Sequence, residues 1–485
     1  MSTTVNLRKV LHRKSMEMCT PALVATGAGM FITGDRGGLM PQNDCVYYVA
    51  GVSAIYNYSP EQDAWMQLPN SGAAGTFGAG ACGEFRCLGA MGGVCDQTAT
   101  AGTTTTLTTN KSIVRSLAGS KIRVVAGTGI GYEGTVASNT VGTNAVITVT
   151  PANGVAFDAT TVFKVWSGSL WFMNSGAGTV GFSVYDRATN AWTARSVTGL
   201  PTTWGTTGQL VSTGSIEGAF ETGTATAGAA STLTNSAKAW PTNCYANAQV
   251  RITAGTGIGQ IRVIASNTGT VLTTAAAWTI NPDATSAYSI EACDDYMYLL
   301  GNNAVTLYRF TISTNTWATL TPGTARSAAL GAGGSADWIH NCPDADWQGA
   351  QGKLHTNAGM LKQNGRFIYS FRGTTTSALD IYDIAANTWW NSMGYGNQTD
   401  TFGSGSSAVD NNGMIYITKE STGRLYRFDV AKNALEPLTT NLHPQGASCE
   451  GDKLVIVTYR DGATVIPFLY TLQQTRVELL RMLLI

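Results

Sequence analysis

The chain has 485 residues, and its 30 Lys and Arg balance its 30 Asp and Glu, so its formal net charge is +0. Charged residues make up only 12% of the chain, which is about half of the usual share. A neutral surface without clustered Lys and Arg argues against nucleic-acid binding. No run of about eighteen apolar residues occurs, so we expect no membrane span. The low charge fits a surface that partner subunits cover, although a neutral secreted β-protein would look similar.

The chain begins with a short basic arm that includes Arg8, Lys9, Arg13 and Lys14. The stretch after it contains Glu17 and lacks the clean apolar core of a signal peptide. Two interpretations stay open for this arm. It is either a solvated tail or an arm that grips a neighbouring subunit.

One spacing occurs five times in the chain. An aromatic residue is followed seven positions later by a large apolar residue, and Asn or Asp lies two positions before that apolar residue. Asp and Asn bond to nearby backbone and tolerate unusual φ values, so this spacing predicts a strand, a tight turn and a second strand. Five copies indicate an internal repeat. The repeat-core pairs are Tyr58 with Trp65, Tyr185 with Trp192, Phe310 with Trp317, Tyr382 with Trp389, and Phe428 with Leu435.

A second apolar run precedes each copy, as at Phe367-Ile368-Tyr369, and small residues precede most of these runs, as at 403–409. Four strands per unit, with small residues on the innermost one, are typical of a propeller blade. The shortest spacing between copies, 46 residues from Trp389 to Leu435, suits a blade repeat. The sequence therefore predicts an all-β fold, a roughly six-bladed β-propeller.

The Tyr-Asp-x-x-x-Asn-x-Trp turn and the Gly-rich strand resemble kelch-type β-propeller repeats. The Gly-Gly pair of such blades is present at Gly92-Gly93 and Gly333-Gly334. Kelch-type propellers include binding scaffolds and a copper oxidase, so the resemblance implies a fold and no single function. No local motif carries the tyrosine, cysteine and two histidines of that oxidase, and we do not expect its site here.

Two long insertions separate the first three copies and match each other. Their shared motifs are Thr-Ala-Thr-Ala-Gly, Ala-Gly-Thr-Gly-Ile-Gly and Ala-Ser-Asn-Thr, which start at Thr98, Ala126 and Ala137 in the first and at Thr224, Ala254 and Ala265 in the second. Abundant Thr, Val and Ile between turn signals predict a small β module in each. The glycine-rich motif lacks the Gly-x-Gly-x-x-Gly spacing, so it is interpreted as a turn and not a nucleotide loop.

This series of motifs resembles modules in virion proteins of tailed bacteriophages, which are often tail, fibre or appendage components. The resemblance covers the two insertions. It implies a virion protein, assembled in the cytoplasm of a bacterial host, whose partners are other virion proteins and copies of itself.

One polar loop is a candidate ligand site. Carboxylates in it could bind a hard cation, although the spacing matches no known calcium loop, and exposed tryptophans could stack on a host-surface glycan. The interpretation that we favour is a loop packed over a blade. The candidate residues are Asp337, Trp338, His340, Asp344, Asp346 and Trp347. The sequence contains no recognisable nucleophile–base pair and no Cys-x-x-Cys pair, so we predict no catalytic residue, metal site or cofactor.

These patterns divide the chain into a propeller, two insertions and two ends. Residues 22–33 could supply a strand that closes the ring, and the apolar spacing near the C-terminus predicts a short helix that caps the propeller or docks on another chain. The predicted divisions are an arm with a closing strand at 1–33, a propeller at 34–95, 165–218 and 291–470, β modules at 96–164 and 219–290, and a helix at 471–485.

The sequence favours a structural component of a tailed-phage virion, in the tail, neck or an appendage, that acts through protein–protein contacts and is not an enzyme. The paired modules and the low charge are the features behind this hypothesis. The alternative is a carbohydrate-binding host-adsorption protein, which predicts exposed aromatic residues on one propeller face. A propeller enzyme, which predicts a bound metal or turnover, is the third hypothesis.

Overall fold

The regular structure of the chain consists of β-strands. The computed structural model describes residues 17–19, 32–34, 46–50, 54–59, 62–68, 81–88, 97–110, 113, 116–174, 180–186, 191–202, 208–214, 219–301, 305–331, 334–338, 365–373, 378–393, 407–409, 414–419, 424–430, 434–441, 453–461, 464–472 and 479–484. These residues form 36 strands and no helix, which confirms the predicted all-β class. Within this part of the chain, nothing forms a helix long and apolar enough to cross a membrane.

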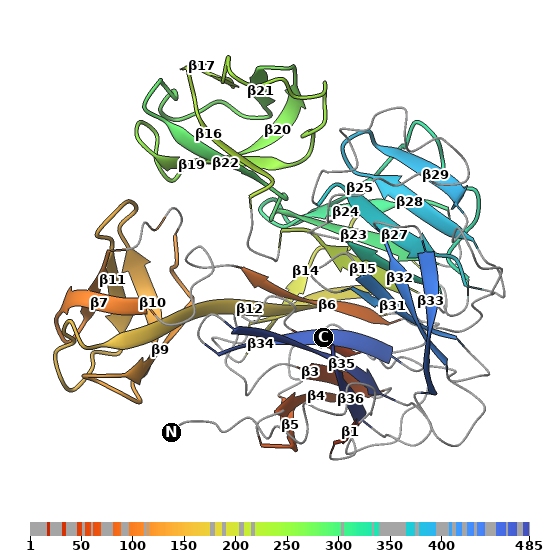
Figure 1. The fold of residues 1–485 in the computed structure, drawn as a ribbon, viewed down its shortest axis with the longest axis horizontal. Helices are drawn as coiled ribbons and strands as arrows, with labels where there is room; N and C mark the ends of the chain where they lie inside the picture. Colours follow the sequence, from red (N-terminus) through yellow and green to blue (C-terminus); the bar gives the residue numbers. More distant parts are fainter. Residues whose placement is uncertain are drawn as a thin grey trace.

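Five sheets have four antiparallel strands each, in a propeller-like arrangement (Figure 1). From the inner to the outer strand, they contain β2 (Ile32–Gly34), β3 (Val46–Ala50), β4 (Ala54–Ser59) and β5 (Ala64–Leu68); β15 (Gly208–Ser212), β23 (Tyr296–Gly301), β24 (Tyr308–Thr311) and β25 (Thr316–Thr319); β26 (Ser335–Trp338), β27 (Phe367–Phe371), β28 (Leu379–Asp383) and β29 (Thr388–Met393); β30 (Ser407–Val409), β31 (Met414–Lys419), β32 (Arg424–Asp429) and β33 (Ala434–Asn441); and β34 (Lys453–Asp461), β35 (Thr464–Leu472), β36 (Leu479–Leu483) and β1 (Glu17–Met18).

A further sheet has nine strands, and one end of it repeats this four-strand pattern. Its strands β6 (Cys82–Leu88), β12 (Val162–Asn174), β13 (Gly181–Asp186) and β14 (Ala191–Arg195) pair in that order. The inner strand β6 contacts β2 and β15, β15 contacts β26, β26 contacts β30, and β30 contacts β34. Since β34 also contacts β2, the inner strands follow one another in a closed series.

Each insertion forms a compact β module, and both modules project from the propeller (Figure 1). In β9, alternate residues point inward, so Ile122 and Val124 are buried in the first core. Val250 and Ile252 are buried in the second core, where Gln249 and Arg251 on the other face of β19 are buried as well. Module 1 contains β7 (Gln97–Gly102), β8 (Thr106–Thr109), β9 (Lys121–Ala126), β10 (Glu133–Asn139), β11 (Val146–Thr150) and the first half of β12; module 2 contains β16 (Glu221–Thr224), β17 (Ala227–Ala229), β18 (Thr232–Thr234), β19 (Gln249–Ala254), β20 (Ile261–Asn267), β21 (Val271–Thr274) and β22 (Ala287–Glu291).

The predicted C-terminal helix at 471–485 is wrong for the described residues, because 471–472 end strand β35 and 479–483 form strand β36. Strand β36 pairs along β35, where Leu472 faces Leu479 and Phe468 faces Leu483. Leu480 and Met482 are buried in that sheet. Pairing satisfies the edge of β35, which a helix would leave exposed, and this tertiary gain outweighs the helical spacing of the leucines.

The two ends of the chain meet in the last sheet. Glu17 lies opposite Arg481 on β36, and the backbone nitrogen of Cys19 donates to the oxygen of Leu479 at 2.8 Å. Of the residues expected to supply a closing strand, 22–31 lie outside the described part of the chain. The remaining ones, Ile32 and Thr33, belong to β2 in the first sheet. The last sheet therefore joins strands from both ends.

Candidate functional site

The five repeat-core pairs face each other directly across the third and fourth strands of their sheets. In the four pairs that consist of two aromatic residues, the ring centroids lie 5.0 to 5.2 Å apart in tilted contact. Such contacts add about 0.5–1.5 kcal/mol beyond the apolar area that they bury. In the fifth pair, Phe428 and Leu435 are both fully buried. The spacing thus places one large apolar pair at a fixed position in the sheet.

The Asn or Asp of the repeat makes the turn that this pairing needs. Asp63, Asn315 and Asn387 have φ values of 49°, 54° and 47°, in the left-handed region that Asn and Asp enter more readily than other non-glycine residues. The hydroxyl of Tyr58 donates to Asp63 Oδ1 at 2.5 Å, and that of Tyr382 donates to Asn387 Oδ1 at 2.7 Å. Burial raises the pKa of both tyrosines, so their hydroxyls remain protonated donors.

The repeat core also joins each sheet to the one before it. Trp317 Nε1 donates to the backbone oxygen of Ser196, which follows the outer strand β14 of the preceding sheet, at 2.9 Å. The rings of Tyr58 and Tyr470 lie 6.1 Å apart and connect the first sheet to the last. These residues form the contact surface between sheets, so they stabilise the fold and are not accessible to a ligand.

The structure buries the described part of the candidate ligand loop. Asp337 and Trp338 lie on β26 with 4% and 1% exposure, and Trp338 Nε1 donates to the oxygen of Gly365 at 2.9 Å. For Trp338 this agrees with the favoured interpretation, a loop packed over a blade, and excludes stacking on a glycan, because its ring fills the core between two sheets. Within the described residues, no group of three or more His, Cys, Asp and Glu could hold a metal ion. Outside those residues lie His340, Asp344, Asp346 and Trp347.

Buried carboxylates in the sheet of β26 to β29 are paired with arginines. Arg366 binds Asp383 through two bonds of 2.7 Å, and Arg326 and Arg372 share Asp380 at 3.1 and 2.7 Å. Burial lowers the pKa of Arg326, while Asp380 opposes this change. Because removing one partner would leave a buried charge uncompensated, these groups hold the sheet and are not available to bind a substrate.

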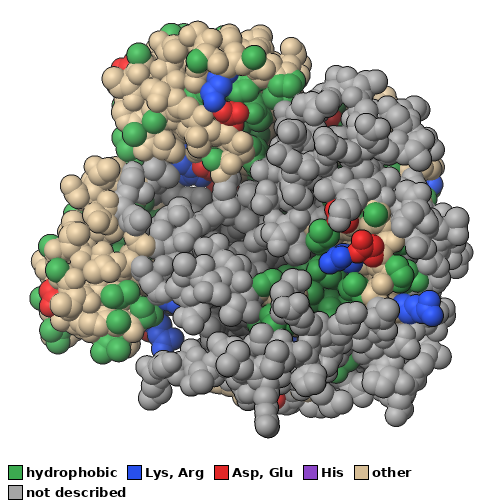
Figure 2. Space-filling view, in the orientation of Figure 1, with side chains coloured by type: hydrophobic (Ala, Val, Ile, Leu, Met, Phe, Trp, Pro, Cys, Tyr) green, Lys and Arg blue, Asp and Glu red, His purple; other side chains and the backbone are tan. Residues whose placement is uncertain are grey.

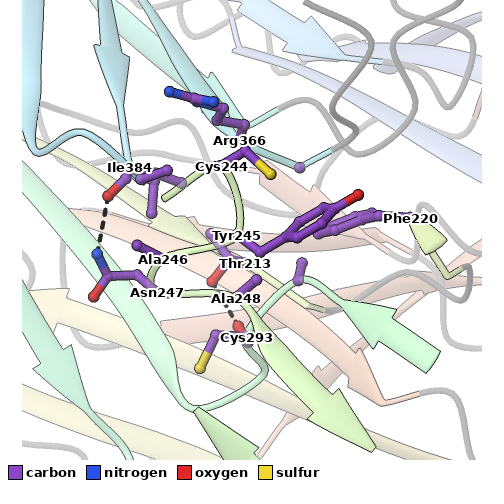
Figure 3. A pocket seen from close by; sticks show the side chains of 13 residues that line it. Thr213, Phe220, Cys244, Tyr245, Ala246, Asn247, Ala248, Cys293, Arg366 and Ile384 are labelled. Atoms are coloured by element: carbon purple, nitrogen blue, oxygen red, sulfur yellow. Dashed lines mark hydrogen bonds between the residues drawn. The ribbon is translucent and has the colours of Figure 1, made fainter. Parts of the chain in front are cut away.

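A small cavity lies where module 2 meets the propeller (Figure 3). Tyr245 and Asn247 of module 2 line it together with Thr213, Cys293 and Arg366 of the propeller. Its volume of about 20 Å³ holds roughly one water molecule. Burial raises the pKa of the Cys293 thiol, which therefore stays protonated and is a poor nucleophile. This geometry suits a fixed contact between domains and has no room for a substrate.

Asn247 is the residue that anchors module 2. Its Nδ2 donates to the backbone oxygen of Ile384 at 3.0 Å, and its Oδ1 accepts from Arg309 Nη1 at 3.1 Å (Figure 3 shows the first bond). The φ of Asn247 is 63°, in the left-handed region that Asn tolerates better than other non-glycine residues do. Phe220 adds an apolar contact with the buried cluster of the neighbouring sheets. We define Asn247, Arg309, Ile384 and Phe220 as the module 2 anchor.

Sequence reasoning did not single out the module 2 anchor. The two modules align through the bonds that Asn139 Oδ1 and Asn267 Oδ1 accept from the backbone nitrogens of Leu117 and Tyr245, at 2.6 and 2.9 Å. At the position of Asn247, module 1 has Gly119, which also has a positive φ, of 85°. The only feature of the sequence that pointed to the anchor was therefore an Asn in module 2 where module 1 has a turn glycine. This difference did not indicate that the Asn has a partner on a distant blade.

Comparisons with known proteins give only distant similarities of fold. No protein-family model and no curated protein matches the chain. A chain of a mitotic checkpoint complex is 10% identical, with a TM-score of 0.35 and coverage of 97% of this chain and 95% of that one. YCF48 bound to a D1 peptide is 8% identical (TM-score 0.31; 98% and 96% covered), and the phage phi92 endosialidase is 9% identical (TM-score 0.32; 98% and 69% covered).

Proposed function

We propose that the chain is a structural component of a tailed-phage virion, in its tail, neck or an appendage, and acts through contacts with other virion proteins and with copies of itself. We also propose that its propeller has six kelch-like blades. The sixth is the group β6, β12, β13 and β14 within the nine-stranded sheet, which has the same strand order and its own repeat-core pair. The closed series of six inner strands supports this count.

The observation that carries this proposal is that the propeller holds two extra β modules in fixed positions. Module 1 continues a blade strand, β12, and module 2 is held by its anchor. Each module adds exposed surface, and Figure 2 shows that this surface has few charged side chains. Fixed, largely uncharged surface suits lasting contacts between subunits.

The mass of the purified chain in solution tests this proposal. Light scattering should give a defined oligomer at micromolar concentration. A variant without residues 1–14 tests the gripping arm and spares β1, whereas a longer truncation would also break the last sheet. A monomer at every concentration that binds a glycan on an array would contradict the assembly role and favour the host-adsorption protein.

A further inference from the structure

The Gly-Thr-Gly-Ile-Gly turn, which we call the tip, has the same backbone conformation in both modules. All six glycines have φ values in the left-handed region, where other residues are strained. The values are 74°, 82° and 87° for Gly127, Gly129 and Gly131 in module 1, and 75°, 80° and 86° for Gly255, Gly257 and Gly259 in module 2. Two tips with one shape present the same backbone surface to a partner.

Module 1 covers the tip of module 2 within the chain. A Cβ atom placed on Gly259 would lie 2.7 Å from Val141 Cγ1, and one on Gly142 would lie 3.9 Å from Ile258 Cδ1. Val141 and Gly142 belong to the turn between β10 and β11. The two modules therefore contact each other head to tail, with the tip of module 2 against the β10–β11 turn of module 1.

The tip of module 1 has no such cover among the described residues. A Cβ on Gly131, at the position of Gly259, would meet no heavy atom within 4 Å. Ile130 is 69% exposed. Val155, on the loop that packs against Gly129, is 58% exposed, close to the 56% of its counterpart Ile280 in module 2, so Ile130 is the residue that distinguishes the two tips. In module 2, the corresponding Ile258 is half-buried. An aliphatic side chain at a preformed turn is therefore left open to solvent.

Among the described residues, the head-to-tail contact leaves one tip and one turn of each chain uncovered. The free turn lies between β20 and β21 of module 2, where Thr268 is exposed. Neither the five residues of the free tip nor the residues of this turn are charged, and the charged residue bound to the tip is Asp158, which accepts a hydrogen bond from Thr128 of the tip at 2.7 Å. A contact that uses two different surfaces repeats from copy to copy and closes a ring when the rotation allows it.

We propose that the free tip of module 1, with Ile130 and Val155, docks on the β20–β21 turn of module 2 in a second copy of this chain. This inference rests on the proposed function, because it names the surface through which copies assemble. In a closed ring, modules 1 and 2 would alternate, and every tip would be covered.

The test compares the solution mass of the wild-type chain with that of Ile130→Asp and Val155→Asp. A buried carboxylate without a partner disfavours the contact, so each substitution should weaken association by roughly tenfold or more. The matched control is Met66→Asp, because Met66 is 52% exposed but lies on β5, away from the modules. Circular dichroism should show that all variants remain folded, since the three positions are exposed.

An oligomer that dissociates in both module variants and not in Met66→Asp supports the inference. A monomeric wild-type chain overturns it together with the proposed assembly role. If the wild-type chain is an oligomer and both module variants keep its mass, this docking surface is overturned and the assembly role is not affected. As a direct check, Ile130→Cys combined with Thr268→Cys should give more dimers with a short bis-maleimide than either single variant, which has the same native cysteines.

Discussion

The two β modules have one fold but are attached to the propeller in different ways. In module 1, the 13-residue strand β12 pairs with β9 in the module and then with β6 and β13 in the blade. In module 2, the chain leaves β22 at Glu291 and starts the blade strand β23 at Tyr296. Phe163 and Tyr288 are equivalent positions in the two modules, and the chain from this position to the blade strand is longer in module 2. The strand is therefore interrupted there, and side chains must hold the module.

One substitution on the shared scaffold contributes to the second attachment, and one arginine that both modules share has a different partner in each. Asn247 replaces the glycine at position 119 of module 1 and bonds to two propeller residues. Arg251, at the position of Arg123, is buried and bonds to Glu291, whereas Arg123 pairs with Glu133 at the surface. The comparison teaches that the fold of a module and its placement are determined by separate sets of residues.

The largest expected effect is that of Trp389→Ala. Trp389 is fully buried in the cluster that Phe220 and Val263 of module 2 also contact, so its loss should cost about 3–5 kcal/mol. Urea unfolding should show this loss, and hydrogen exchange should rise in module 2 more than in module 1. Equal exchange in the two modules would contradict the proposed difference in attachment. Met66→Ala, at an exposed site, is the control.

Arg251→Ala in module 2 should lower the free energy of unfolding more than Arg123→Ala in module 1. The Arg251 side chain is 2% exposed and its partner Glu291 is 22% exposed, so removal should cost about 2–4 kcal/mol, somewhat less than for a fully buried pair. Removal of Arg123 should cost less than about 1 kcal/mol, because its pair with Glu133 is exposed. Chemical denaturation of both variants checks this, and similar losses would show that burial does not separate the two pairs.

Asn247→Gly removes the hydrogen bonds of the module 2 anchor but keeps the positive φ accessible. The expected cost is about 1–2 kcal/mol, with hydrogen exchange rising at β19 and β22. The reciprocal change Gly119→Asn is the matched control and should cost less, since no heavy atom of the described residues lies within 4 Å of a Cβ there and Asn tolerates the left-handed φ of 85° better than other non-glycine residues do. A loss at both positions would point to the turn itself and away from the anchor.

The smallest effect concerns acid stability, where the two modules should behave alike. Hydrogen bonds from Thr160 and Thr128 lower the pKa of Asp158, and those from Thr285 and Thr256 lower the pKa of Asp283. Because the folded pKa is depressed, each carboxylate stabilises the fold above the unfolded pKa of about 3.9, and this contribution is lost as the pH falls through the folded value. Below pH 5, the melting temperature should depend less steeply on pH for Asp158→Asn and for Asp283→Asn than for the wild-type chain, and by equal amounts in the two variants.

Much of the local structure was predictable from the sequence, because it depends on short-range chemistry. The repeat spacing located the turns at Asp63, Asn315 and Asn387, whose side chains tolerate a positive φ, and the strand pairs on either side of them. The matching glycine motifs in the insertions likewise predicted two copies of one β module. Alternation of apolar residues such as Ile122 and Val124 determined which face is buried.

The candidate site could not be predicted in the same way, because exposure and partners depend on contacts between distant segments. Trp338 belongs to a polar stretch, yet its strand places the ring in a core between sheets. Asn247 is one turn residue among many until module 2 lies against Arg309 and Ile384.

The sequence by itself determined the all-β class, the repeat and the duplicated modules, since periodicity and turn residues act over a few positions. Only the tertiary structure decided that the last segment is a strand, because the edge of β35 was there to pair with it. It also decided that one module tip is covered by Val141 while the tip that carries Ile130 stays open, since identical turns differ only in what the fold brings against them.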